Sequence, residues 1–481
     1  MCCGCDYIGV RVFAMRIFSI RTTLGKQLML LILFVFLAPI NSIAVENLNH
    51  RSPVAITPGA PPVATLELQR DAALASQILL TNGTAVPSLP SALGLRGVLI
   101  ETVDRQLVLE QSADQSFNPA SCVKLATALA ALRSFGANYR YNTGVWTDGT
   151  FDKSTGTITG DLIISGRDPS FHWEHAVMLA QELNRLGIRT VTGDLIVGPS
   201  FTMDFDVSAQ RSGNYLYDTL DASRRSMFAT QAWTEQRIAV GDTASLQTIP
   251  SVAVMGAVYV DSVRPRARIL LTHKSSKLTD VLKALLCFSN NFMAELIGDT
   301  LGGPEGVRQT MISKFGINPA EIRLASTSGL RANRMTPRAM MKILRALRDE
   351  LAIYGLTPSE IMPVAGIDPG TLEKRYVQNP SRGSVIAKTG TLPRTDGGAS
   401  ALAGQMRTAS GEILLFVIFN MSGDVERFRE YQDALVTQVQ CARGGPAPFS
   451  YLPQPLTIRL AGSEIDTTQR GRADEYEPGT K

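Results

Sequence analysis

The sequence is poor in cysteine, histidine and charged residues. Only 19% of its 481 residues are charged, and it contains six cysteines and four histidines. Three cysteines precede a hydrophobic run near the N-terminus, and the other three (Cys122, Cys287 and Cys441) show no metal-ligand or redox spacing. His172 and His175 alone cannot complete a metal site. We therefore expect no disulfide framework, no metal and no other cofactor.

Only one long hydrophobic run is present, at residues 28–40. It follows four basic residues and is shorter than the roughly 20 residues that a membrane span needs. Small residues after it offer a cleavage site, so we interpret residues 1–44 as a cleaved secretory signal peptide rather than an uncleaved anchor. A start at Met15 would give a signal of more usual length. We expect a secreted, periplasmic protein, with a loose membrane association left open.

A strong charge of either sign is also lacking. The formal net charge is +4, and residues 1–44 hold four basic residues and one acidic residue, so the remainder carries about +1. A nearly neutral protein lacks the basic surface to which nucleic acids bind. We therefore expect no nucleic-acid partner.

The length and the 44% hydrophobic content predict a globular protein of two or three units. Residues 45–70 are rich in proline and small residues, which is typical of a linker, and residues 446–481 predict a disordered tail. Residues 71–138 and 269–445 combine strands with apolar helices, whereas residues 139–268 contain short strands, turns and one helix. We interpret this middle block as a domain inserted into the core that the two flanking ranges form together.

The core ranges predict an antiparallel sheet with helices packed on it. Apolar runs joined by turn-rich loops predict its five strands, at residues 97–103, 106–110, 383–391, 399–406 and 412–419. A helix with a cap at Asp424 follows the last strand. This combination gives an α+β fold. The inserted block, with similar strand starts at residues 160–164 and 193–197, predicts a smaller α/β domain.

The stretch from Asn118 to Leu132 predicts a buried helix with a marked start. Its leucines recur at helical spacing, Pro119 suits a first turn, and Gly136 follows the end. Ser121 and Lys124 are three residues apart, so they share one face of this helix. A serine beside an amine whose charge can be adjusted is the minimal activated nucleophile.

Two further motifs follow in the chain. Ser289-Asn290-Asn291 interrupts an apolar helix, and Lys388-Thr389-Gly390 ends a strand where glycine lets a substrate backbone approach closely. Each motif alone is weak: Ser121 could be a helix cap, Lys124 a surface charge, and Ser289 and Asn291 ordinary helix residues. Their placement in one order favours a single catalytic site over three coincidences.

The three motifs together resemble those of the penicillin-binding proteins and serine β-lactamases. The middle block is similar to that of the D-alanyl-D-alanine carboxypeptidase/endopeptidase family of low-molecular-mass penicillin-binding proteins, which carry an extra domain between the first and second motifs. Further motifs shared with this family are Gly160-Asp-Leu, Gly166-Arg-Asp-Pro-Ser, Gly193-Asp-Leu, Ser328-Gly-Leu and Gly370-Thr-Leu. The resemblance covers residues 75–440. It implies a serine β-lactamase/transpeptidase-like core, a five-stranded antiparallel sheet flanked by helices plus a helical subdomain, with the smaller domain inserted.

The resemblance also implies catalytic roles. Ser121 would attack the carbonyl of a D-Ala-D-Ala bond and form an acyl-enzyme, and Lys124 would take its proton. Ser289 would relay that proton to the leaving nitrogen, while Asn291 would orient Lys124 and the substrate amide. These residues, Ser121, Lys124, Ser289 and Asn291, are the predicted catalytic set.

The residues of the third motif would bind the substrate. Lys388 and Thr389 would hold the terminal carboxylate through charge-assisted bonds, and Gly390 would let the peptide approach. The backbone N–H groups of Ser121 and Thr391 would form an oxyanion hole. The partners implied are peptidoglycan stem peptides as substrate and β-lactam antibiotics such as penicillins as inhibitors.

Two other functions fit part of the pattern. A serine β-lactamase would hydrolyse its acyl-enzyme quickly, but the sequence has no convincing Glu-x-x-Leu-Asn stretch to hold the water. An inert wall-binding protein on the same fold has no chemical need to keep Ser121, Lys124 and Lys388. We therefore predict a serine-type D-Ala-D-Ala carboxypeptidase, with or without endopeptidase activity.

Overall fold

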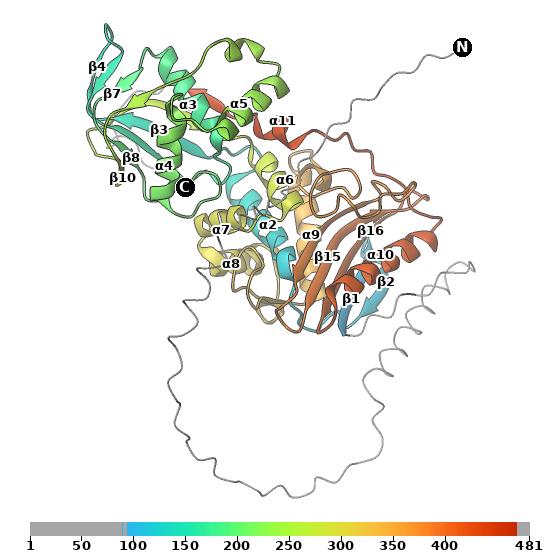
Figure 1. Cartoon of the computed structure of the whole chain (residues 1–481). Coiled ribbons are helices and arrows are strands. Elements are labelled where there is room, and N and C mark those ends of the chain that lie inside the picture. The colour runs from blue at the N-terminus through green and yellow to red at the C-terminus, as the bar shows by residue number, and fades with distance from the viewer. Residues whose placement is uncertain (1–88, 90–93, 469–481) are drawn as a thin grey trace, which may run out of the picture. The chain divides into compact units, whose positions relative to one another are not determined.

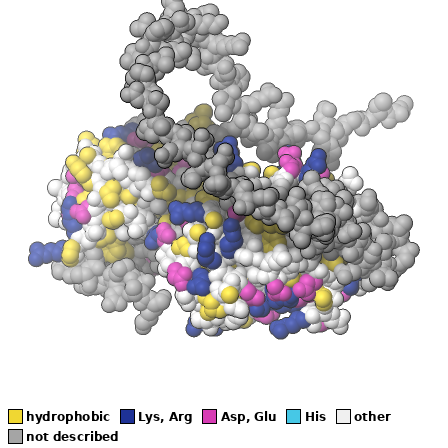
Figure 2. Space-filling model, turned by 90° about the horizontal axis from the view of Figure 1, so that it is seen from below, with side chains coloured by type: hydrophobic (Ala, Val, Ile, Leu, Met, Phe, Trp, Pro, Cys, Tyr) yellow, Lys and Arg dark blue, Asp and Glu magenta, His cyan; other side chains and the backbone are white. Residues whose placement is uncertain are grey.

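The computed structural model describes residue 89 and residues 94–468 (Figure 1). The predicted signal peptide, linker and last residues of the tail therefore lie outside the described residues. Within the described part, no helix is long and apolar enough to cross a membrane. Basic, acidic and apolar side chains are mixed on the face of the molecule that Figure 2 shows.

The core contains a five-stranded sheet in which every neighbouring pair is antiparallel, which confirms the predicted α+β fold. The strands lie in the order β14–β15–β16–β1–β2, so the N-terminal hairpin extends the C-terminal meander at its edge. Their bounds are β1 (Leu95–Thr102), β2 (Leu107–Gln111), β14 (Val385–Leu392), β15 (Ala399–Arg407) and β16 (Ile413–Met421).

Helices cover both faces of this sheet, which explains why β15 and β16 are buried at nearly every position rather than at alternate ones. On one face, α10 (Val425–Cys441) buries Phe428 and Leu435 against Leu402 and Ile418. On the other face lie α9 (Pro337–Ala352) and α2 (Val123–Phe135), which share a second core with the sheet.

The helical subdomain surrounds α2. This helix contacts α6 (Leu278–Phe288), α7 (Asn291–Thr300) and α8 (Gly303–Phe315), and residues 123–132 are all buried. A short two-stranded sheet, β12 (Ile322–Arg323) with β13 (Arg334–Met335), flanks the turn that leads back to α9. The start of α2 is thus fixed by packing on several sides.

The inserted domain contains a mixed six-stranded sheet in the order β10–β8–β6–β3–β11–β17. Its strands are β3 (Asn142–Thr147), β6 (Leu162–Gly166), β8 (Leu195–Val197), β10 (Val258–Val260), β11 (Arg268–Lys274) and β17 (Glu464–Asp466). A smaller four-stranded sheet comprises β4 (Thr150–Asp152), β5 (Thr157–Thr159), β7 (Thr190–Val191) and β9 (Ala253–Val254). The helices are α3 (Trp173–Arg185), α4 (Ala209–Leu220) and α5 (Met227–Ala239). Only the first of these helices was expected.

Two predicted boundaries differ from the structure. The inserted domain was expected to end at residue 268, but β11 continues to Lys274 and pairs with β3 of the insert. The prediction of a disordered tail from residue 446 was wrong for residues 446–468, because α11 (Leu456–Leu460) packs on α6 and β17 pairs with β11. Apolar anchors such as Leu456 order this segment, in which apolar residues are as frequent as polar ones.

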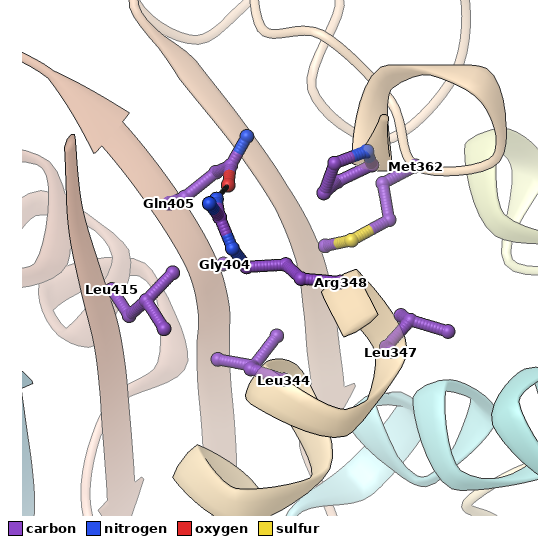
Figure 3. A pocket seen from close by; sticks show the side chains of 8 residues that line it. Leu344, Leu347, Arg348, Met362, Gly404, Gln405 and Leu415 are labelled. Carbon is purple, nitrogen blue, oxygen red and sulfur yellow. Dashed lines mark hydrogen bonds between the residues drawn. The ribbon is translucent and has the colours of Figure 1, made fainter. Parts of the chain in front are cut away.

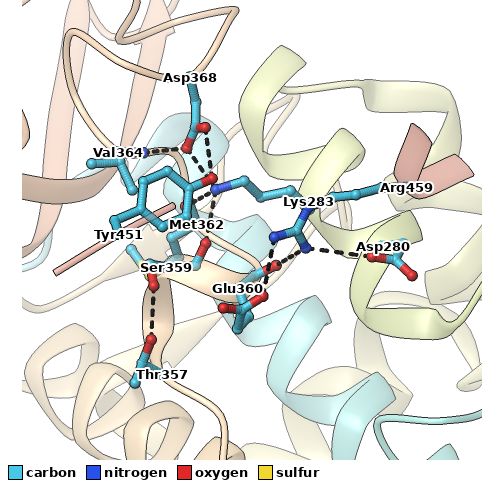
Figure 4. Close-up of polar contacts among 10 residues, drawn as sticks. All are labelled: Asp280, Lys283, Thr357, Ser359, Glu360, Met362, Val364, Asp368, Tyr451 and Arg459. Carbon is cyan, nitrogen blue, oxygen red and sulfur yellow. Dashed lines mark hydrogen bonds and ion pairs between the residues drawn. The ribbon is translucent and has the colours of Figure 1, made fainter. Parts of the chain in front are cut away.

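A buried polar cluster attaches this C-terminal segment to α6 (Figure 4). Lys283 is fully buried, lies 2.6 Å from Asp368, and also donates to the carbonyl groups of Ser359 and Met362. The hydroxyl of Tyr451 donates to the other oxygen of Asp368 at 2.8 Å. A buried charge needs this degree of compensation, since an unpaired one is strongly destabilising.

We expect Lys283→Met to lower the free energy of unfolding by about 3 kcal/mol or more, because it leaves the carboxylate of Asp368 buried without its cation. The matched control is Lys342→Met, which breaks an ion pair with Glu321 in which the lysine side chain is 41% exposed. That change should cost less than about 1 kcal/mol. Denaturant unfolding measures both changes in the free energy of unfolding. Equal losses in the two variants would contradict the conclusion that the buried pair of Lys283 matters more for stability than the exposed pair of Lys342.

Candidate active site

Ser121 lies where a short 3₁₀ turn, Ala120–Cys122, leads into α2. Two backbone segments pack so closely against this turn that each requires glycine at the point of contact. A Cβ on Gly390 of β14 would lie 2.7 Å from the carbonyl oxygen of Pro119, and a Cβ on Gly329 would lie 2.1 Å from that of Ala120. No other residue allows such an approach, so these glycines hold Ser121 close to the Lys-Thr-Gly strand.

The side chain of Lys124 is fully buried and its amine has three neighbours. It lies 3.1 Å from Ser121 Oγ, 2.8 Å from Asn291 Oδ1 and 2.5 Å from the carbonyl oxygen of Ser328. Burial lowers the pKa of Lys124 to about 6, with a further contribution from the positive charge of Lys388. The amine is therefore largely neutral at pH 7.

The three neighbours determine the direction in which the lone pair of this neutral amine points. The carbonyl oxygens of Asn291 and Ser328 can only accept hydrogen bonds, so they take the two N–H groups of Lys124. The remaining lone pair then faces Ser121 Oγ, whose hydroxyl can donate. This is the arrangement that a general base beside a nucleophile requires.

The second motif lies at the junction of two helices. Helix α6 ends at Phe288, Ser289 adopts a left-handed conformation (φ +55°), and the side chain of Asn290 caps α7 by accepting from the N–H of Met293. Asn291 is consequently the first residue of α7 and points its amide oxygen to Lys124. The expectation that this motif interrupts an apolar helix agrees with the structure.

The third motif lies on β14. Lys388 is fully buried, its amine donates to the carbonyl of Thr389 at 2.8 Å, and burial lowers the pKa of Lys388 to about 8. The thiol of Cys122 donates to the Lys388 carbonyl at 3.2 Å, which ties the strand to the turn that carries Ser121. Lys388 therefore does not line the cavity itself, but its charge lies close behind Thr389, which does.

A cavity of about 420 Å³ joins the predicted residues. Its lining includes Ser121, Ser289, Thr389, Gly390 and Thr391 from the three motifs. Lys124 is hydrogen-bonded to Ser121, and Asn291 to Lys124. The structure thus brings the predicted catalytic and binding residues to one place. The other lining residues, which the sequence analysis missed, are Thr371, Arg375, Ser400 and Arg429.

The two arginines among these residues differ in setting. Arg375 is paired with Asp433, at 2.5 Å from Nη2 to Oδ1. Arg429 is exposed on α10 and its Nη2 donates to the hydroxyl of Thr391 at 3.0 Å. No short motif marks either position, because Arg429 reaches the site through the packing of α10 on the sheet and Arg375 is held there by Asp433 of the same helix.

A second hollow lies between α9 and the sheet (Figure 3). It measures about 10 Å³ and is lined by apolar side chains such as Leu344 and Leu415, with Arg348 donating to Gln405 at one side. This volume holds no more than a single water molecule. The hollow is a packing gap and not a substrate site. Among residues 89 and 94–468, no cluster of His, Cys, Asp or Glu side chains could hold a metal ion.

We expect the amine of Lys124 to titrate near pH 6 and this pKa to rise in Lys388→Met, because that substitution removes a like charge that disfavours the protonated form. NMR titration of lysine-labelled protein measures both values, with the resonance assigned through Lys124→Arg. Lys153→Met, on a turn of the inserted domain, serves as the control that leaves the pKa unchanged. An ordinary lysine pKa near 10 would contradict the neutral-base arrangement.

The chain is similar to several known proteins. The carboxypeptidase of Mycolicibacterium smegmatis is 26% identical to this chain and the alignment covers 82% of this chain and 93% of the relative. The D-alanyl-D-alanine carboxypeptidase of Actinomadura is 25% identical over 450 residues, covering 73% of this chain and 82% of the relative. The structure of a penicillin G-acylated predatory endopeptidase of Bdellovibrio bacteriovorus, in complex with an immunity protein, matches with a TM-score of 0.64 at 22% identity, over 77% of this chain and 100% of that one.

The structural likeness shows a shared fold, and the family follows from the sequence. The model of the D-Ala-D-Ala carboxypeptidase 3 (S13) family matches residues 80–213 and 246–441, which is more than half of the chain. The unmatched residues between them include α5 of the inserted domain. The resemblance found in the motifs is confirmed, and the chain belongs to the D-Ala-D-Ala carboxypeptidase 3 (S13) family of peptidases.

Proposed function

We propose that this protein is a serine-type D-Ala-D-Ala carboxypeptidase that cleaves peptidoglycan stem peptides through an acyl-enzyme on Ser121. The observation that carries the proposal is the position of the Lys124 amine, which has two hydrogen-bond acceptors and Ser121 Oγ as its three neighbours. Family membership supports the reaction class. The geometry supports the assignment of individual residues to its steps.

The first step is the acylation of Ser121. Lys124 takes the proton of Ser121 as Oγ attacks the carbonyl carbon of the penultimate D-Ala, and the carbonyl oxygen becomes an oxyanion. The backbone N–H groups of Ser121 and Thr391 stabilise that oxyanion. Ser289, on the cavity wall, passes the proton from Lys124 to the leaving nitrogen, which departs as the amine of free D-Ala. Water then hydrolyses the ester, regenerating Ser121 and releasing the shortened peptide.

The substrate carboxylate binds beside β14. The hydroxyl groups of Thr389 and Thr391 line this end of the cavity, and Lys388 supplies positive charge from behind them. Arg429 adds a guanidinium in contact with Thr391. Penicillins carry a carboxylate next to a strained amide, so the same groups hold them while Ser121 opens the ring. The acylated endopeptidase with the same fold supports this extension to β-lactams.

Cleavage of cross-links is a second candidate activity of the same site. Its support is that Arg429, at the carboxylate end of the cavity, is exposed, and we interpret this as an opening toward solvent for a longer leaving group. We also propose a secreted, periplasmic location, which the substrate requires and the N-terminal sequence pattern favours. A loose membrane association is compatible with this location.

Incubation with benzylpenicillin should add one penicillin mass to the protein spanning residues 45–481, and Ser121→Ala should gain none. Intact-mass spectrometry measures the adduct, and circular dichroism confirms that the variant is folded. Ser313→Ala, on the outer face of α8, is the control that retains the adduct. Drug that is consumed without a lasting adduct would indicate a β-lactamase. No adduct and no consumption on folded parent would favour an inert wall-binding protein.

We expect Arg429→Gln to lower kcat/KM for a peptide ending in D-Ala-D-Ala by roughly 10-fold or more, mainly through KM, because it removes a charge-assisted contact to the carboxylate. Arg427→Gln, two residues earlier on the same exposed helix segment, should leave kcat/KM unchanged. The parent should cleave the C-terminally amidated peptide slowly, with no further loss in Arg429→Gln. Steady-state kinetics of D-Ala release measures these values, and equal sensitivity of both peptides would rule out this role.

A further inference from the structure

Glu295 has a hydrogen-bonding role that none of the three motifs includes. Its two carboxylate oxygens accept four hydrogen bonds from two consecutive residues. Oε2 accepts from the N–H and hydroxyl of Thr327, at 3.2 and 2.7 Å, and Oε1 accepts from the N–H and hydroxyl of Ser328, at 3.2 and 2.5 Å. The carboxylate thus fixes the backbone at both residues.

The turn that Glu295 holds reaches the active site directly. The carbonyl oxygen of Ser328 accepts from the Lys124 amine at 2.5 Å, so the carboxylate and the amine act on opposite sides of the same residue. On the next turn of α2, the hydroxyl of Thr127 donates to the carbonyl of Thr327 at 2.7 Å. Residues 327–328 therefore bridge α7 and α2.

Packing leaves this bridge little freedom. Thr327 and Ser328 are fully buried, and a Cβ on Gly298, one turn beyond Glu295, would lie 2.3 Å from the Thr327 hydroxyl oxygen. Glu295 is four residues after Asn291 on α7, so both side chains lie on one face of that helix. On this face of α7, Asn291 itself accepts a hydrogen bond from Lys124, and Glu295 fixes the second acceptor, which is the Ser328 carbonyl.

Glu295 also acts on Lys124 through its charge. The titratable groups that act on Lys124 are Lys388 from β14, Glu295 from α7 and Cys122 from the turn before α2. Burial and Lys388 lower the pKa of Lys124, and the negative charge of Glu295 opposes them. Burial raises the pKa of Glu295, but the hydrogen bonds from Ser328 and Thr327 outweigh it, so the carboxylate is ionised at neutral pH.

We propose that Glu295 is a positioning residue for the general base: it fixes the Ser328 carbonyl that holds one N–H of Lys124 and so aims the lone pair at Ser121. This inference rests on the proposed function of Lys124. It assigns Glu295 no contact with substrate. The predicted consequence is that Glu295 controls both how fast Ser121 is acylated and the pH at which acylation begins.

The test compares acylation by benzylpenicillin across pH 4–9 in the parent and in Glu295→Gln. An amide cannot accept all four hydrogen bonds, so the plateau rate should fall by roughly 10-fold or more. Because Lys124 must be neutral, the rate rises with pH through the pKa of Lys124. Removing the opposing negative charge lowers this pKa, and the acid limb should move to lower pH by about 0.5–1 unit.

A second variant separates the effect of the position of the carboxylate from the effect of its charge. Glu295→Asp keeps the charge but shortens the side chain, so the plateau rate should fall while the acid limb moves much less than in Glu295→Gln. The matched control is Glu182→Gln, another half-buried glutamate, which pairs with Arg185 in the inserted domain. It should change neither value. Thermal unfolding of each variant verifies that the fold is retained.

The outcomes are distinct. A lower rate in Glu295→Gln with an unmoved acid limb would reduce Glu295 to a structural residue and overturn the inference, as would an unchanged rate. The NMR titration of Lys124 in Glu295→Gln reads the same pKa shift without any reaction. It therefore tests the influence of Glu295 on Lys124 even if the parent fails to react with penicillin, in which case the proposed function fails separately.

Discussion

The burial of the Lys124 amine is the constraint on which the rest of the core depends. A charged amine in this environment would be strongly disfavoured, so the group is held in its neutral form and provided with acceptors. Those acceptors come from α7 and from the turn at residue 328, far apart in the sequence. A base of this kind exists only when both segments are packed against α2, so its chemistry is a property of the tertiary structure.

The same packing explains why two glycines and one thiol lie around Ser121. The start of α2 is enclosed by the turn at Gly329 and by β14 at Gly390, both closer than a Cβ would allow. The thiol of Cys122 is buried and donates to a strand carbonyl, and burial raises its pKa to about 12. It is a packing residue beside the nucleophile and has no thiolate character of its own.

Sequence patterns predicted those parts of the structure that depend on local spacing. The five core strands follow from apolar runs between turns, and the motif residues from Ser121 to Thr391 follow from short fixed spacings. Glu295 and Arg429 could not be found in this way, because an exposed arginine or a helical glutamate is ordinary until its neighbours are known. Helix α4 was missed because Ser212, Gly213 and Asn214 within it are typical turn formers, and α5 because its apolar residues recur without a clear helical period. The tail was misjudged because residues 446–481 were considered as one segment, although its charged residues are concentrated after residue 468 and its first part contains apolar anchors.

That tail has a consequence for the site. Residues 464–466 complete the sheet of the inserted domain, while Tyr451 binds Asp368, the partner of Lys283 on α6. Helix α6 ends immediately before Ser289, and the backbone of Thr371 donates to Cys287 within its last turn. The C-terminal segment is therefore joined both to the inserted sheet and to the helix that presents the second motif. Disturbing it should affect the position of Ser289 even though no residue of the segment lines the cavity, which makes the segment part of the architecture of the active site.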